Sequence, residues 1–139
     1  MTNDYAPFRI TGVNTATMGV PTNDGSPGSA LYAVPLTLSR PLSNFEQQAM
    51  VAVWDAPPSS TTMHRPGTAR CYMDSFVLSS TTVEEVRDYH LQTLTGVVAK
   101  VNELSERNHR EAIQRHDAEA ARLVEHKKNV EDVAKGLSF

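Results

Sequence analysis

Cysteine is almost absent from this chain of 139 residues, which contains Cys71 alone. A single thiol excludes an internal disulfide, and the paired cysteine and histidine spacings of zinc sites are missing as well. Cys71 lies within a predicted strand, so we expect a small buried thiol with a structural role. No phosphate-binding glycine loop, dinucleotide fingerprint or serine-nucleophile motif occurs. The sequence therefore predicts no metal, no cofactor and no catalytic residue, and it favours a protein that is not an enzyme.

The chain also has no surplus of basic residues, because it contains 13 Lys and Arg and 16 Asp and Glu, for a net charge of −3. Binding to nucleic acid without regard to base sequence requires a basic surface that displaces counterions. Docking on an anionic membrane requires a similar surface. No run of residues approaches the roughly 18 consecutive apolar residues of a membrane span. The first ten residues lack the basic flank and apolar run of a secretory signal. We therefore expect a cytoplasmic protein that binds neither nucleic acid nor membranes.

Proline and glycine are scarce in the C-terminal part of the chain. All eight prolines lie within residues 1–81, whereas residues 82–135 contain no proline and one glycine, Gly96. The second stretch is rich in Ala, Glu, Arg, Leu, Val and Lys, which favour a helix. This change in composition predicts two domains, a small α/β head of residues 1–81 and a long amphipathic helical arm of residues 82–139.

Strand-like and helix-like stretches alternate in the predicted head. Residues 8–20, 30–39 and 69–79 have the β-branched and aromatic composition of strands. Residues 44–54 follow Ser43, which forms a capping-box pattern with Glu46, and this pattern predicts a helix.

The order of these elements predicts an α+β fold. We expect a small three-stranded, mainly antiparallel sheet with one short helix, followed by a long C-terminal helix that could form a coiled coil. We expect the helix of residues 44–54 and the first turns of the long helix to cover one face of the sheet. Residues 30–78 taken alone also fit a βαβ unit, so the strand order stays open.

The long helix is predicted to begin at Thr82 and to continue to about Lys135. Thr81 and Thr82 each precede a glutamate by three residues, which makes two overlapping capping boxes. Beyond this start, apolar residues recur at alternating spacings of three and four in two seams, which a polar stretch at residues 105–111 separates. Such spacing is typical of a coiled coil. The predicted helix interface comprises Leu94, Val97, Val101, Leu104, Ile113, His116, Leu123 and Val130.

Three arrangements of the arm fit this pattern. The first seam also fits packing against the sheet of the head, and the whole arm could be a solvated helix without a partner. Pairing with a second copy or with another helix is the third arrangement. A helical hairpin is disfavoured because no Gly or Pro turn follows Gly96 until residue 136.

Histidine and arginine provide the remaining candidate site residues. His64 and Arg65 lie in a predicted loop. They could bind an anion or an acidic partner surface, or they could belong to a plain surface turn. His109 and His116 share one face of the arm, where two copies could bring imidazoles together. Their spacing of seven residues is too wide for two ligands of one metal ion, so ordinary polar positions or a pH effect on association are the simpler interpretations.

These observations lead to two functional hypotheses. The first is a small cytoplasmic interaction or assembly protein whose arm mediates self-association, as a dimer or higher oligomer, or binds a helical protein partner. The second is an oligomeric small-molecule-binding protein or enzyme with a site between head domains. A pocket that includes His64 and Arg65 would favour the second hypothesis.

Overall fold

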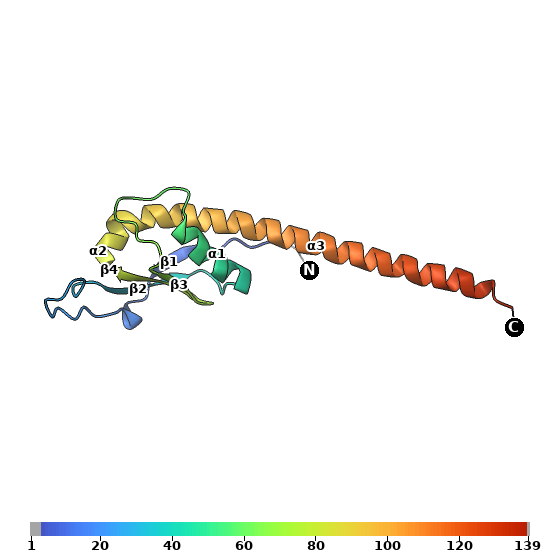
Figure 1. Ribbon diagram of the computed structural model, residues 1–139, viewed down its shortest axis with the longest axis horizontal. Coiled ribbons are helices and arrows are strands. Elements are labelled where there is room, and N and C mark those ends of the chain that lie inside the picture. The colour runs from blue at the N-terminus through green and yellow to red at the C-terminus, as the bar shows by residue number, and fades with distance from the viewer. Residues whose placement is uncertain (1–3, 139) are drawn as a thin grey trace. The chain divides into compact units, whose positions relative to one another are not determined.

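The computed structural model describes residues 4–138 and has an α+β fold (Figure 1). Its elements follow the order β1 (Ile10–Val13), η1 (Thr15–Thr17), β2 (Tyr32–Leu38), α1 (Asn44–Asp55), β3 (Ala69–Cys71), β4 (Ser75–Thr81), α2 (Val83–Glu85), η2 (Val86–His90) and α3 (Leu91–Lys135). The three helical segments α2, η2 and α3 are contiguous, so the long helix predicted from Thr82 is confirmed.

The sheet has four strands in the order β1-β2-β4-β3, and each neighbouring pair is antiparallel. The predicted number of three strands was therefore wrong. Residues 69–79 do not form one strand, because the chain turns after Cys71 and returns as β4, with the Tyr72 N–H donating to the Ser75 carbonyl at 2.7 Å. The antiparallel pairing of β2 with β4 also excludes the βαβ alternative.

The first predicted strand is shorter than its composition indicated. Of residues 8–20, only Ile10–Val13 form a strand, and the short helix η1 follows. Asn14 caps η1, because its side-chain oxygen accepts from the Ala16 N–H at 3.1 Å. This local hydrogen bond to the Asn14 side chain favours the short helix over a continued strand ladder, so β1 ends at Val13.

Helix α1 begins as its capping box predicts. The Ser43 hydroxyl accepts from the Glu46 N–H at 3.2 Å, and the Glu46 carboxylate accepts from the Ser43 N–H at 3.0 Å. Both bonds satisfy amides that have no partner inside the helix. The same carboxylate is buried against the guanidinium of Arg40, 2.6 Å away.

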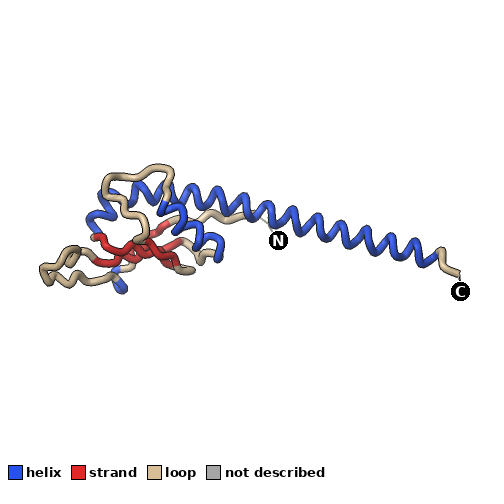
Figure 2. Tube along the Cα trace, viewed as in Figure 1, coloured by secondary structure: helices blue, strands red, loops and turns tan. Residues whose placement is uncertain are grey.

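The hydrophobic core lies between the sheet and two helices. Register pairs Val34 with Leu78 and Leu36 with Phe76, and all four side chains are buried. Figures 1 and 2 show α1 and the first turns of α3 on the same side of the sheet, as expected. The helices contribute Met50, Trp54, Val86, Leu94, Val97 and Val101 to this core. Because side chains two residues apart in a strand point to the same side, Val34 and Leu36 share one face of the sheet with Phe76 and Leu78, and both helices pack on this face.

The chain forms two compact units. The head unit is Ala6–Ser105 and contains every strand together with α1, α2, η2 and the first turns of α3. The arm unit contains the rest of α3, and its described residues are 4–5 and 106–138. Within residues 4–138, the helices offer no apolar stretch that would reach across a bilayer.

Candidate functional site

The arm unit exposes a periodic row of apolar side chains along α3. Between residues 106 and 138, no described side chain is buried. Leu123 and Val130 on α3, and Leu137 two residues after its end, are spaced by seven residues and are 53%, 52% and 57% exposed. Ile113, the first large apolar residue of this row, is half-buried. We call the row formed by Ile113, His116, Ala120, Leu123, Lys127, Val130, Ala134 and Leu137 the arm seam.

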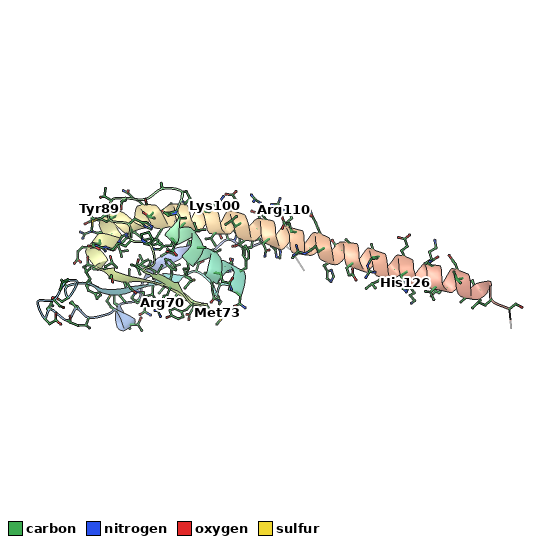
Figure 3. All side chains as sticks on the ribbon, in the orientation of Figure 1. Arg70, Met73, Tyr89, Lys100, Arg110 and His126 are labelled. Carbon is green, nitrogen blue, oxygen red and sulfur yellow. The ribbon has the colours of Figure 1, made fainter. Side chains whose placement is uncertain are left out.

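Polar side chains of the arm unit bond to one another along the helix. Arg110 donates to Glu106 at 3.0 Å, and Arg122 pairs with Glu119 at 2.5 Å. Figure 3 shows side chains, among them the labelled Arg110 and His126, standing off α3 along its length. Exposed pairs of this kind contribute only about 0.2–0.5 kcal/mol each. They support helicity, but they do not replace the packing that most protein helices depend on.

The two predicted interface seams have different surroundings. Leu94, Val97 and Val101 are buried in the core of their own head unit, and Leu104 is half-buried at its end. Their periodic spacing is thus explained by packing on the sheet, and these side chains are not available to a second helix in this fold. Ile113, His116, Leu123 and Val130 belong to the arm seam, which remains the candidate interface.

The histidines of the arm unit differ in their contacts. His109 lies against the ring of Tyr5, with 6.3 Å between ring centroids. His116 is exposed, and its Nδ1 lies 3.8 Å from the Asp117 carboxylate. Among the described residues, no three His, Cys, Asp or Glu side chains are grouped closely enough to hold a metal ion.

A second candidate site is a cluster of polar and aromatic side chains in the head unit. The Trp54 indole contacts two imidazoles, with centroid distances of 4.5 Å to His64 and 5.6 Å to His90. Both ring nitrogens of His64 and Nδ1 of His90 are buried and have no hydrogen-bond partner among the described residues. Buried polar atoms without partners are rare in folded proteins and require an explanation. We call Trp54, His64, Arg65, Glu85 and His90 the histidine cluster.

Arg65 connects the loop of the cluster to the start of the long helix. Its guanidinium donates to the Glu85 carboxylate at 2.9 Å and 3.4 Å and to the Ser80 carbonyl at 2.8 Å. The Thr81 hydroxyl donates to the same Glu85 carboxylate at 2.8 Å. The charge of Arg65 is therefore already paired, and an external anion would have to displace Glu85 from it.

Electrostatics in the cluster follow from these contacts. The hydrogen bond from Arg65 and a second one from Thr81 lower the pKa of Glu85, although burial opposes them. Burial lowers the pKa of His90, and the charges of Arg65 and His64 act in the same direction, whereas Glu85 opposes them. His90 is thus held in its neutral form inside the head unit.

Unusual backbone conformations surround the cluster. The segment η2 is a five-residue π-helix that ends at His90, and Ser80 has a left-handed backbone with φ of 55°. π-Helical turns and left-handed non-glycine residues cost free energy and concentrate at functional sites. Within η2, Tyr89 is 41% exposed and labelled in Figure 3, whereas His90 is only 2% exposed. The wider turn places His90 against Trp54.

Sequence reasoning identified His64 and Arg65 but did not connect them with the rest of the cluster. His90 stands in line with the first seam, and a histidine among valines and leucines was the available signal. Trp54 ends the predicted helix of residues 44–54, and Glu85 belongs to the capping box of Thr82. Glu85 does take part in this cap, because its N–H donates to the Thr82 hydroxyl at 3.1 Å.

An open groove of about 710 Å³ lies elsewhere in the head unit, between the end of α1 and α3. Small apolar residues form much of its wall, including Ala52, Ala56, Gly96 and Ala99. A Cβ atom added to Gly96 would meet no atom within 4 Å, so close packing does not require this glycine. The groove does not include His64 or Arg65, the residues that would have favoured a ligand site.

Cys71 has the surroundings of a structural thiol. Burial raises its pKa to about 12, and the nearby charge of Glu46 adds to this effect. A thiol with so high a pKa contains almost no thiolate near neutral pH, and the thiolate is the reactive form.

We expect Cys71→Ala to reduce stability by no more than about 1–2 kcal/mol, because only one sulfur atom is removed from a half-buried position. The mass of the particle in solution should not change. Urea unfolding and sedimentation measure the two quantities, and a changed mass of a folded variant would contradict a purely structural role.

Comparison of the chain with models of protein families, with curated proteins and with solved structures gives no significant match.

Proposed function

We propose that this protein is a small assembly protein that self-associates through the arm seam, with a second copy of the chain as its partner. The observation that carries the proposal is the row formed by half-exposed Leu123 and Val130 on α3 and continued by Leu137 just after the helix, in a segment without any buried side chain among its described residues 106–138. A helix held only by local interactions is marginally stable in water, so an unpartnered seam would be costly.

The spacing of the seam favours another copy of the same helix. Its residues alternate strictly at intervals of three and four, which is the pattern of side chains that interlock between two supercoiled helices. An identical seam on a second copy matches this pattern over the same length. Burial of one large apolar side chain stabilises an interface by about 1.5–3 kcal/mol when that side chain is fully exposed before association.

Polar members of the seam limit how two copies can align. His116 and Lys127 interrupt the apolar row, and both are exposed. Single polar residues at such positions reduce stability but specify register and the number of chains. We therefore interpret the seam as a weak but specific interface, in which the head units are brought together by a reversible association of the arms.

The mass of the particle in solution tests this proposal. At concentrations of about 1–100 μM, a range that covers weak to moderate association, sedimentation equilibrium should show a mass that rises toward twice the 15.3 kDa of one chain. A second chain should also protect the amides of Glu106–Lys135 from hydrogen exchange as the concentration rises. A mass of one chain at every concentration would overturn the proposal.

A further inference from the structure

The loop between α1 and β3 is attached to the head unit by the histidine cluster. The Trp54 indole N–H donates to the Arg65 carbonyl at 3.2 Å, and the Arg65 guanidinium binds Glu85 and Ser80 on the other side. Nearer the end of the loop, the Gly67 N–H donates to the Asp55 carboxylate at 2.8 Å. The whole segment 56–68 lacks helix and strand, so its position depends on these bonds, on the bond from the Ser79 N–H to the Thr68 carbonyl at 2.8 Å, and on the contact of His64 with Trp54.

His90 lies next to Glu85, the acceptor of the Arg65 bonds. Its Nε2 is 3.9 Å from the Glu85 carboxylate oxygen that accepts from both Arg65 and Thr81. This distance is too long for a hydrogen bond. Its Nδ1 is buried without a partner among the described residues, and its ring packs nearly perpendicular to the Trp54 indole. The neutral imidazole thus fits its site through packing and makes no compensating polar bond.

We propose that His90 acts as an acid-sensitive latch for the loop of residues 56–68. The loop is held closed while the imidazole is neutral, and it loosens when His90 takes up a proton. This inference is independent of the arm seam, because every residue that carries it belongs to the head unit.

Protonation changes the competition for Glu85. The cationic His90 needs a hydrogen-bond acceptor, and the Glu85 carboxylate is the anionic group that faces it. Glu85 can approach His90 only by weakening its bonds to Arg65, which lies on the loop. Arg65 and His64 meanwhile repel the new charge from the loop side. Both effects favour an open loop, in which water can reach the imidazolium.

The direction of the pH effect follows from the cluster. Because burial lowers the pKa of His90, the closed state binds protons less readily than the open state, in which the pKa is near the ordinary value of about 6.5. The closed state is therefore fully favoured above about pH 6.5 and loses stability as the pH falls through that value toward the lower closed-state pKa. Glu85 has a lowered pKa, so its bond to Arg65 is lost only at more acidic pH, below its ordinary range.

Hydrogen exchange at two positions reports the opening. The Trp54 indole N–H and the Gly67 amide both bond across the base of the loop. Between about pH 7.5 and 5.2, after correction for the intrinsic exchange rate, their protection should fall by up to tenfold for each pH unit below about 6.5, until the pH reaches the closed-state pKa of His90. Amides of β4 that pair with β2 should keep their protection over this range.

Two variants separate His90 from other titrating groups. His90→Phe keeps an aromatic ring against Trp54 but cannot take up a proton, so the protection of both N–H groups should become independent of pH. His126→Gln removes an exposed histidine of the arm unit and should retain the full response. A wild-type protein without a pH response, or an equal response in His90→Phe, would overturn the proposal.

The wild-type protein also provides a test that does not depend on the folding of a variant. The ring protons of His90, followed by NMR, should titrate with the same midpoint as the loss of protection at Trp54 and Gly67. Different midpoints would show that another group opens the loop and would overturn the latch.

Discussion

Replacing Trp54 with alanine should lower the free energy of unfolding of the head unit by about 3–5 kcal/mol, the usual range for removal of a large buried aromatic side chain. Trp54 is 1% exposed and contacts Phe76, His64 and His90 at centroid distances between 4.5 Å and 6.3 Å. Its removal leaves a cavity between α1 and the sheet and takes away the N–H that bonds to Arg65. Urea unfolding followed through the NMR signals of β4 measures the change without a contribution from the arm.

Two further variants separate the parts of this effect. Trp54→Phe keeps an aromatic ring but removes the indole N–H, and the Arg65 carbonyl still accepts from the Thr68 hydroxyl at 2.6 Å. We expect Trp54→Phe to retain more than half of the stability that Trp54→Ala loses. Tyr72→Ala removes a side chain that is 52% exposed and should change stability by less than about 1 kcal/mol. If Trp54→Ala lowered the free energy of unfolding no more than Tyr72→Ala does, Trp54 would not be central to the core.

Local sequence signals predicted the helix boundaries because the stabilising bonds are themselves local. Ser43 with Glu46, and Thr82 with Glu85, cap their helices over a separation of three residues. Such bonds depend little on the rest of the fold. The α+β class followed from the composition on either side of these boundaries, and the structure confirms it.

The fourth strand could not be recognised in the same way. β3 has only three residues, and the turn after Cys71 contains neither glycine nor proline. Without such residues, the stretch 69–79 has the composition of one continuous strand. The pairing of Cys71 with Phe76 reveals the hairpin, and this pairing depends on contacts with the sheet rather than on a local turn signal.

The histidine cluster was missed for a related reason. Trp54, His64 and His90 come from a helix, a loop and a π-helical turn, separated by 10 and 26 positions in the sequence. No motif spans these distances, and side-chain packing alone brings the rings together. Periodicity likewise could not distinguish the two seams, because packing on a sheet and packing on a second helix select the same spacing. Burial separates them, with Val97 inside the core and Leu123 exposed.

Replacing both Leu123 and Val130 with aspartate should abolish self-association at micromolar concentration. About half of each side chain is exposed in a single chain, so burial in a pair contributes about half of the full value of 1.5–3 kcal/mol per side chain. Four such side chains per dimer amount to about 3–6 kcal/mol, which corresponds to an increase in Kd of about 10²–10⁴-fold. Aspartate in the seam adds desolvation and like-charge repulsion, so this range is a lower bound.

A matched variant places the same charges outside the seam. Ala118 and Ala121 are exposed and, at 100° per residue, lie on the side of α3 away from Leu123. Ala118→Asp with Ala121→Asp adds the same net charge to a neighbouring part of the helix and has a larger cost in helix propensity, because alanine is the strongest helix former. Sedimentation equilibrium should show dimers for this variant at concentrations where the seam variant is monomeric. Circular dichroism at high concentration should show comparable helix content for the wild type and the matched variant. If both double variants dissociated equally, charge or loss of helicity would explain the result. If neither dissociated, the interface would lie elsewhere on the chain and the arm seam would not be the assembly surface.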